Sequence, residues 1–339
     1  MNKPFDSSNH RTRQPKSTVK ESGAQPVAQV RLHTIAEHEA GQRIDNFLLR
    51  ICKGVPKSWV YRVVRKGEVR VNKGRIDVDY KLQTGDIVRI PPVRVSESKP
   101  TSVPSHRATQ LPIIFEDDSL LIIDKPAGLA VHGGSGVSFG VIEQLRAAYP
   151  KLKFLELVHR LDKETSGLLV LAKKRSALVH LHEQIRNGRM DKRYYAILKG
   201  ALEQPVTHVQ AALHKYVSAN GERRVVVAHE SEGQSAHTQF NIDRVFHLSS
   251  DANHPYTAVR VKIFTGRTHQ IRVHSASIDH PIIGDDKYGD FELNKVLAKK
   301  TGQRMFLHAH TLRFKHPQTD ELLSVTAPIP KAFTDFMNG

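Results

Sequence analysis

The sequence contains one cysteine, Cys52, among 339 residues. A single cysteine excludes an internal disulfide framework and a zinc site built on several thiolates, and it is typical of a reducing compartment. No segment approaches the roughly 18 consecutive apolar residues that span a bilayer, and no apolar stretch follows the basic N-terminus as it would in a signal peptide. We therefore expect a soluble, cytoplasmic protein without membrane contact, in which Cys52 is a small core residue.

Motifs for cofactors and metals are also missing. The glycine-rich segment 131–140, "VHGGSGVSFG", matches neither the P-loop nor the dinucleotide-binding pattern, so we interpret it as a flexible rim of a site. His269 and His274 are five residues apart and would lie on different faces of a helix, without an evident third ligand. Clustered carboxylates, or an H-x-E with P-C-x-x-C as in zinc deaminases, do not occur. We expect neither a cofactor nor a metal.

The sequence has fewer acidic than basic residues. The chain has 51 Lys and Arg against 34 Asp and Glu, a formal net charge of +17. Such an excess favours a polyanionic partner through counterion release, and nucleic acid is a better candidate than an anionic membrane. Residues 41–94 hold 13 basic and 5 acidic residues, and this net charge of +8 is nearly half of the excess. The concentration of charge predicts a nucleic-acid-binding module in this part of the chain.

Composition divides the chain into four parts. Residues 1–27 are polar and basic with almost no aliphatic content, which predicts a disordered tail. Residues 28–94 combine two short helical patterns with short strands and predict a small α+β domain. Residues 95–110, rich in Ser, Pro and Lys, predict a linker. Residues 111–335 form the second and larger domain.

The small domain has a basic helix face. Ile44, Phe47, Leu48 and Ile51 have the spacing of a buried stripe on the first helix. On the second helix and the strand after it, cations lie opposite the apolar positions, and a solvated charged face is the alternative to a phosphate contact. Together with "RKGEVRVNKGR" and "TGDIVRI", this pattern resembles the S4-type RNA-binding domain. The resemblance predicts RNA contacts at Lys57, Arg62, Arg65, Lys66 and Arg70.

The larger domain alternates strands and helices without a regular βαβ repeat. Strand patterns occur near 168–172, 194–198, 257–264 and 304–314, and helical patterns occur near 140–149, 176–187 and 268–278. "IIFEDDSLLIIDKP" reads as two apolar strands around an acidic turn. We expect an α+β fold with a mixed, largely antiparallel sheet and flanking helices.

Two polar clusters are candidates for chemistry. In "VHRLDKETSG", Asp162 lies in a loop before an apolar strand, with Arg160 and Lys163 on either side, so it could be a nucleophile or a base. A structural salt-bridge loop is the alternative. In "FTGRTHQIRVH", Arg267 is expected at a strand-to-helix corner, within reach of an anion or a buried carboxylate. In "DKRYYAIL", one tyrosine should face the core and the other the opposite side.

Four segments in this order resemble the RluA family of pseudouridine synthases: "IIDKPAGLAVH", "VHRLDKETSGLLVLAK", "DKRYYAIL", and "TGRTHQIRVH" with "HPIIGDDKYG". Within the family, the segments are most similar to the enzymes that modify 23S ribosomal RNA. The resemblance extends from Leu111 to about Pro328. It implies the pseudouridine synthase fold and an isomerase that flips specific uridines out of the RNA.

The resemblance also implies roles for single residues. Asp162 is the nucleophile and Tyr194 the active-site tyrosine. Arg267 is expected to pair with the aspartate, Arg160 to contact the RNA, and Ile271 to pack near the target base. The expected partner is 23S ribosomal RNA or the pre-ribosomal large subunit, with no obligate protein partner and a monomeric state. The alternatives are the same chemistry on transfer RNA, and a non-catalytic S4-type RNA-binding or ribosome-associated protein.

Overall fold

The computed structural model describes residues 29–52, 55–93, 111–133, 139–219, 221–249, 251–302 and 304–339. The chain forms two compact units, Met1–Lys99 and Pro100–Gly339. The predicted tail, residues 1–27, and the predicted linker, residues 95–110, lie outside the described residues. The division between the units falls within the predicted linker, and the four predicted domain boundaries stay predictions.

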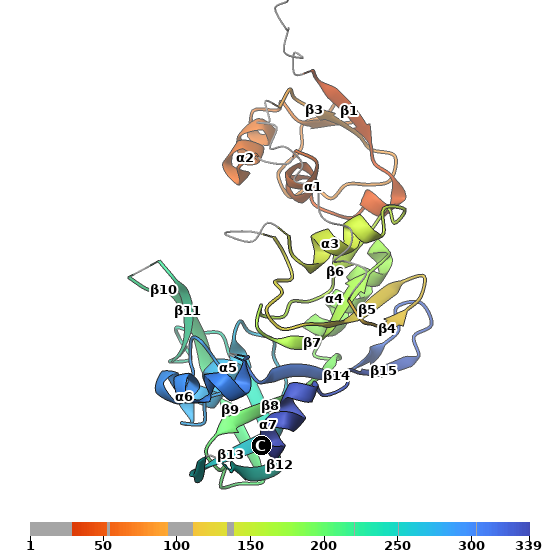
Figure 1. Ribbon diagram of the computed structural model, residues 1–339. Coiled ribbons are helices and arrows are strands. Elements are labelled where there is room, and N and C mark those ends of the chain that lie inside the picture. The colour runs from red at the N-terminus through yellow and green to blue at the C-terminus, as the bar shows by residue number, and fades with distance from the viewer. Residues whose placement is uncertain are drawn as a thin grey trace, which may run out of the picture. The chain divides into compact units, whose positions relative to one another are not determined.

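The first unit is a small α+β domain (Figure 1). Its three strands form an antiparallel sheet in the order β1-β3-β2. The stripe expected on the first helix is largely buried, and Cys52 is 1% exposed within the same core, as predicted. In chain order, the elements are β1 (Arg31–Thr34), the 3-10 helix η1 (Glu37–Glu39), α1 (Ile44–Ile51), α2 (Lys57–Arg65), β2 (Arg70–Val71) and β3 (Ile87–Ile90).

A buried carboxylate, Glu39, links three segments of this unit. It accepts hydrogen bonds from Arg50 at 2.7 Å and from the backbone of Ala36 at 3.2 Å, and it lies 2.7 Å from the ring of His33. Burial alone would raise the pKa of Glu39, but the hydrogen bonds with His33 and Arg50 outweigh burial and lower it from 4.5 to about 2. Glu39 is therefore ionised in the folded unit at any pH above about 2.

The lowered pKa predicts an acid-sensitive first unit. Because the folded pKa lies below the unfolded one, the stabilisation by Glu39 is complete above about pH 4.5 and is lost as the pH falls toward 2. The loss should be on the order of 3 kcal/mol. Urea unfolding followed by fluorescence of Trp59, the single tryptophan of the chain, reports on this unit. The stability difference between wild type and Glu39→Gln should shrink between pH 5 and 2, and a constant difference would contradict the assignment.

The second unit is built on one large sheet. Its helices are α3 (Val141–Ala148), α4 (Arg175–Arg186), α5 (Gln270–Ser277), α6 (Phe291–Thr301) and α7 (Lys331–Asn338). Its strands are β4 (Ile113–Glu116), β5 (Leu120–Lys125), β6 (Glu156–Leu157), β7 (Ser166–Ala172), β8 (Asp191–Lys199), β9 (Val206–Gln210), β10 (Ala212–Val217), β11 (Arg223–Ala228), β12 (His237–Leu248), β13 (Asp251–Ile263), β14 (Leu307–Lys315) and β15 (Leu322–Thr326).

The sheet has the mixed, largely antiparallel character that the sequence predicts. Its strand order is β4-β5-β7-β14-β8-β13-β12-β9, with β15 paired to β14 and β6 to β7. Only the β7–β14 pair is parallel among the described strand pairs. The separate β10–β11 hairpin extends away from the large sheet (Figure 1). The expected strand pair around the acidic turn is present as β4 and β5.

The central strands are covered on both faces, which explains their unbroken apolar sequences. On β5, Leu120 and Ile122 pack into a core with α4, and Leu121 and Ile123 pack into a second core with α3. A third core lies where β8, β12 and β13 pack against α7. Three apolar cores therefore pack against the sheet.

A row of three paired residues, Gly167, Ala309 and Tyr194, crosses the neighbouring strands β7, β14 and β8. On β14, Ala309 is paired with Gly167 of β7 on one side and with Tyr194 of β8 on the other. Gly167 has a φ of +106°, and a Cβ there would lie 2.2 Å from the carbonyl oxygen of Ala309. The close approach of β7 to β14 therefore requires glycine at this position.

Replacing Gly167 by alanine should destabilise the second unit by at least about 3 kcal/mol, because backbone strain and a backbone clash add together. Gly188 is the matched control, since its φ is +65° but nothing lies within 4 Å of an added Cβ. Gly188→Ala should cost only about 1–2 kcal/mol, the strain of a left-handed residue. Urea unfolding followed by circular dichroism measures the free energy of unfolding of both variants. Equal losses of stability would show that the clash at Gly167 is relieved.

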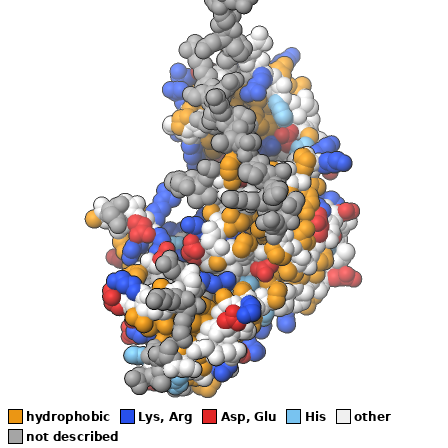
Figure 2. Space-filling view, viewed as in Figure 1, with side chains coloured by type: hydrophobic (Ala, Val, Ile, Leu, Met, Phe, Trp, Pro, Cys, Tyr) orange, Lys and Arg blue, Asp and Glu red, His pale blue; other side chains and the backbone are white. Residues whose placement is uncertain are grey.

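In the part of the chain that the structure describes, no helix is long and apolar enough to cross a membrane. On the face seen in Figure 2, Lys and Arg side chains lie among Asp, Glu and hydrophobic ones.

Candidate active site

Asp162 lies in the loop between β6 and β7, close to the row that joins the two halves of the sheet. The loop is fixed by hydrogen bonds from the backbone of Thr165 to that of Asp162 at 3.2 Å and from Gly128 to Lys163 at 3.0 Å. Beneath it, the fully buried Lys125 donates to the carbonyl of Lys163 at 3.0 Å. Burial lowers the pKa of Lys125 to about 8. The catalytic candidate therefore sits on a loop that is tied to a buried cation.

The guanidinium group of Arg272, on α5, contacts the Asp162 carboxylate. Its Nη1 donates to Oδ2 of Asp162 at 3.2 Å, while Nε and Nη2 each donate to the Asp285 carboxylate at 2.7 Å. Nη2 also donates to Asp286 at 3.0 Å. Arg272 is 3% exposed, and burial, which lowers its pKa, is outweighed by Asp285 and Asp162, so its pKa is raised. Arg272 therefore stays charged and holds one oxygen of Asp162.

The sequence-based pairing of Arg267 with Asp162 is wrong. The Nε of Arg267 donates to the carbonyl oxygen of Ser235 at 3.0 Å, and Arg272 makes the contact with the aspartate. The reason lies at the start of α5, where His269 has a φ of +52° and the helix begins only at Gln270. Arg267 remains outside the helix, while Arg272 is carried into the interior.

The second oxygen of Asp162 faces a histidine. Oδ1 lies 3.8 Å from Nε2 of His269, whose Nδ1 is 2.7 Å from the hydroxyl of Tyr288. Burial lowers the pKa of His269 and outweighs the opposing effect of the Asp162 charge. At neutral pH the ring is therefore mostly uncharged, and Oδ1 has no charged partner among the described residues.

Tyr194 and Tyr195 point to opposite sides of β8, as the strand pattern predicts. Tyr195 is buried in the core with α7 and donates to Asp243 at 2.7 Å. Tyr194 lines the same cavity as Asp162. Burial and, to a smaller extent, the Asp162 charge raise the pKa of Tyr194. Its hydroxyl therefore stays protonated at neutral pH.

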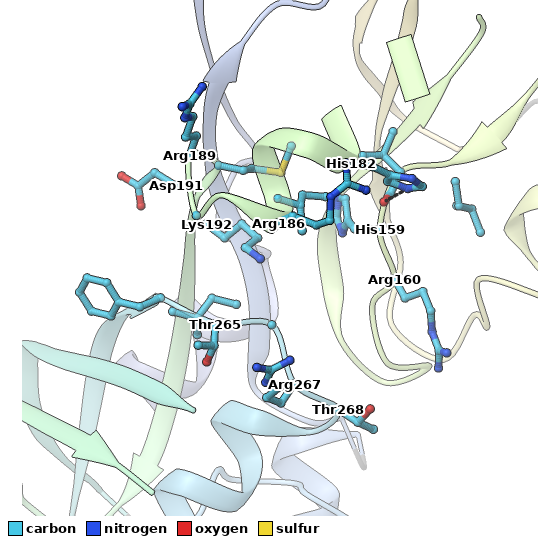
Figure 3. Close-up of a pocket in the computed structure, with 18 of the residues that line it drawn as sticks. His159, Arg160, His182, Arg186, Arg189, Asp191, Lys192, Thr265, Arg267 and Thr268 are labelled. Atoms are coloured by element: carbon cyan, nitrogen blue, oxygen red, sulfur yellow. Dashed lines mark hydrogen bonds between the residues drawn. The ribbon is translucent and has the colours of Figure 1, made fainter. Parts of the chain in front are cut away.

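These side chains border a cavity of about 1230 Å³. Arg160, Asp162, Tyr194 and Arg267 line it, so the structure brings together four of the predicted site residues. Arg160 and Arg267 come from different sides of the cavity, Arg160 from the loop before β7 and Arg267 from the corner before α5 (Figure 3). Ile271 is 4% exposed and lines a smaller adjoining pocket that Asp162, Tyr194 and Arg272 share.

Comparison with known proteins agrees with this geometry. The family model described as RNA pseudouridylate synthase matches residues 119–277, and that of the S4 domain matches residues 42–88. Ribosomal large subunit pseudouridine synthase C of Pasteurella multocida is 51% identical over 88% of this chain and 90% of that protein. The protein of the same name from Yersinia pestis is 52% identical over 88% and 92%. This chain belongs to the RNA pseudouridylate synthase family.

A solved structure supports the fold of this pseudouridylate synthase. Human RNA Pseudouridylate Synthase Domain Containing 1 superposes with a TM-score of 0.57 at 23% identity, over 71% of this chain and 91% of the human one. The predicted fold class, with its mixed sheet and an S4 domain near the N-terminus, is confirmed. The family model and the named relatives at about half identity confirm the predicted isomerase acting on RNA.

The basic residues predicted on the S4 domain of this synthase lie in the first unit. All are exposed, and none forms an ion pair with a carboxylate in the described ranges. Their role in RNA binding stays a prediction. The residues are Lys57, Arg62, Arg65, Lys66 and Arg70.

Sequence reasoning missed Arg272 and its buried partner Asp285, although both lie in quoted motifs of the synthase family, "TGRTHQIRVH" and "HPIIGDDKYG". A buried arginine and a distant acidic pair give no periodic signal in the sequence. Among the described residues, no group of three or more His, Cys, Asp or Glu could hold a metal ion.

Proposed function

We propose that this chain isomerises uridines of 23S ribosomal RNA in the large subunit to pseudouridine, with Asp162 as the nucleophile. The printed names of the relatives at about half identity support this substrate class. The observation that supports Asp162 is its geometry. One carboxylate oxygen is held by the buried Arg272, the other has no charged partner among the described residues, and Asp162 lines a cavity large enough for a nucleotide.

The reaction breaks the bond between N1 of uracil and C1′ of ribose and forms a bond between C5 and C1′. The proton on C5 leaves and N1 gains a proton, so the net change is an isomerisation. An intermediate with a detached base must be held and kept from water, which requires an extruded nucleotide in an enclosed pocket. Asp162 can serve by attack on C1′, by attack on C6, or by stabilising charge as a glycal forms.

Each of these routes needs one carboxylate oxygen that is free to approach the substrate. Arg272 hydrogen-bonds Oδ2 and fixes the plane of the Asp162 carboxylate, which leaves Oδ1 to react. Because Arg272 is also held by Asp285 through two short hydrogen bonds, its position does not depend on the substrate. The pair is therefore organised before RNA binds.

The remaining residues serve the flipped nucleotide. Tyr194 keeps its proton and its ring can stack on uracil, or its hydroxyl can pass a proton in the glycal route. Ile271 supplies an apolar contact to the base. Arg160 and Arg267, which both line the cavity, contact the RNA around the extruded nucleotide (Figure 3).

The first unit completes the proposal. It supplies S4-type contacts to structured RNA through Lys57, Arg62, Arg65, Lys66 and Arg70. The enzyme acts as a cytoplasmic monomer that needs no protein partner or cofactor. Analytical ultracentrifugation of the purified chain, with and without RNA, tests the oligomeric state.

Pseudouridine mapping tests the substrate. Ribosomal and transfer RNA from cells without this gene should lack discrete pseudouridines in 23S RNA, and a plasmid with the wild-type gene should restore them. Loss of sites in transfer RNA alone would reassign the substrate. If no site changes, the chain is a non-catalytic RNA-binding protein.

A further inference from the structure

The carboxylates that line the large cavity are all neutralised from outside it. Asp162 is paired with Arg272 at 3.2 Å, Asp191 with Arg193 at 2.9 Å, and Glu156 with Arg146 at 2.7 Å. None of the three arginines lines the cavity itself. The three carboxylates that line the cavity are therefore paired with arginines outside it, and they form no ion pair with the cations that line it.

Six cations line the same cavity. None forms an ion pair with a carboxylate in the part of the chain that the structure describes. Two of them, Arg160 and Arg267, flank the flipped nucleotide in the proposed function. The other four come from the end of α4, the turn after it, and the neighbouring strands β8 and β13. They are Arg186, Arg189, Lys192 and Lys262.

Lys192 is the most informative of these four. It lies two residues before Tyr194 on β8, so both side chains are on the same face of the strand. Burial lowers the pKa of Lys192, and no described carboxylate or carbonyl accepts a hydrogen bond from its ammonium group. The group lies beneath Gly266, where an added Cβ would be 3.2 Å from Nζ. A half-buried, unpaired cation is costly unless an anion from outside compensates it.

The neighbours of Lys192 add positive charge, and the acid next to it in sequence, Asp191, is paired with Arg193. Arg186 and Arg189 are exposed and line the same cavity as Lys192. The ring of His159 is buried below them, and burial lowers its pKa to about 4, so it is neutral. Lys262 is placed differently, with its ammonium group 4.8 Å from the ring centre of Phe264. We call Lys192, Arg186 and Arg189 the basic wall of the cavity, in which the Arg189 side chain is directed away from Lys192 (Figure 3).

The size of the cavity shows what this wall can hold. About 1230 Å³ exceeds the roughly 300–1,000 Å³ of a pocket for one small ligand. The extruded uridine occupies the end at Asp162 and Tyr194, and the basic wall continues beyond it. Nucleotides joined to the uridine on one side have room to lie along this wall, and each carries one phosphate.

We propose that Lys192, Arg186 and Arg189 bind backbone phosphates of the RNA strand that flanks the target uridine on one side. This subsite rests on the proposed function and extends it. It holds the strand in the bent path that an extruded nucleotide requires, and Lys192 contacts the phosphate nearest the uridine. Because the contact is the same in the ground state and the transition state, it contributes to binding and not to the chemical step.

The test uses a synthetic RNA fragment that spans one uridine modified by the wild-type enzyme. Lys192→Gln, Arg186→Gln and Arg189→Gln should each weaken binding and reduce the slope of log affinity against log salt concentration by about 0.7–0.9. The rate at saturating RNA should stay within about threefold of wild type while KM rises. Lys331→Gln, an equal charge change on the exposed helix α7, is the control and should change neither value.

A second measurement locates the contact and covers a variant that folds poorly. Fragments with one neutral methylphosphonate linkage, placed in turn on each side of the uridine, are bound to wild type and to each variant. Neutralising the contacted phosphate should weaken RNA binding by the wild type but not by Lys192→Gln. The other linkages should not show this non-additivity. If every linkage affects wild type and the three variants equally, the proposal is wrong. If wild type modifies no uridine in ribosomal RNA, the proposed function fails instead.

Discussion

Replacing Asp162 by asparagine should lower the rate of pseudouridine formation at saturating RNA by at least about four orders of magnitude, the scale seen when a catalytic nucleophile is removed. The amide keeps the size of the carboxylate and can still accept a hydrogen bond from Arg272. It cannot act as a nucleophile or carry the negative charge that the reaction requires. Arg272 also keeps Asp285 and Asp286 as partners, so the fold should be retained.

Single-turnover assays with tritium at C5 of uridine measure this rate, because the proton on C5 leaves during the reaction. Equilibrium binding of the same RNA should be unchanged within about threefold. Asp191→Asn is the matched control, since Asp191 lines the same cavity but is paired with Arg193, and it should keep most of the activity. An Asp162→Asn enzyme with more than a few per cent of wild-type activity would remove Asp162 from the chemistry.

Replacing Arg272 by methionine should abolish activity and destabilise the second unit by about 3–5 kcal/mol, because it leaves the buried Asp285 without its partner. Arg267→Met should have a far smaller effect on stability. Arg267 is exposed and loses one hydrogen bond to a carbonyl, so stability should change by no more than about 1 kcal/mol. Urea unfolding followed by circular dichroism compares the two variants.

Two further variants separate folding from catalysis. Arg272→Lys keeps the positive charge but cannot donate to Asp162 and to both oxygens of Asp285 at once, so it should regain stability more than activity. The double variant Arg272→Met with Asp285→Asn removes both charges of the buried pair and should be more stable than Arg272→Met alone, yet equally inactive. If Arg267→Met is the more damaging change, the pairing of Arg272 with Asp162 is not the one that matters in solution.

Local patterns in the sequence predicted much of this fold. The apolar stripe of α1 follows from its helical spacing, and the strands β5 and β7 follow from unbroken apolar runs. The structure has all three elements where they were expected. The placement of Asp162 in a loop before a strand and of Tyr194 on a strand also follows from local sequence. That the two lie in one cavity was implied by the family motifs, since they are separated by more than thirty residues and no local pattern joins them.

The choice between Arg267 and Arg272 could not be made locally. The two lie five residues apart on either side of a strand-to-helix corner, and the backbone of His269 decides which one faces inward. A non-glycine residue with positive φ is not signalled by composition or periodicity. Similarly, the strands β9 and β12 lie in a stretch without a family motif, and their places in the sheet depend on the pairing of β12 with β13 and of β9 with β12.

The row of Gly167, Ala309 and Tyr194 has a consequence for the synthesis of the enzyme. Tyr194 is translated more than a hundred residues before β14, the strand that joins β7 to β8. Domains fold as their segments emerge, so β5 and β7 can pair before β14 is present, whereas the row that joins Gly167 to Tyr194 cannot form. A nascent chain is therefore unable to complete the active site until β14 has emerged from the ribosome.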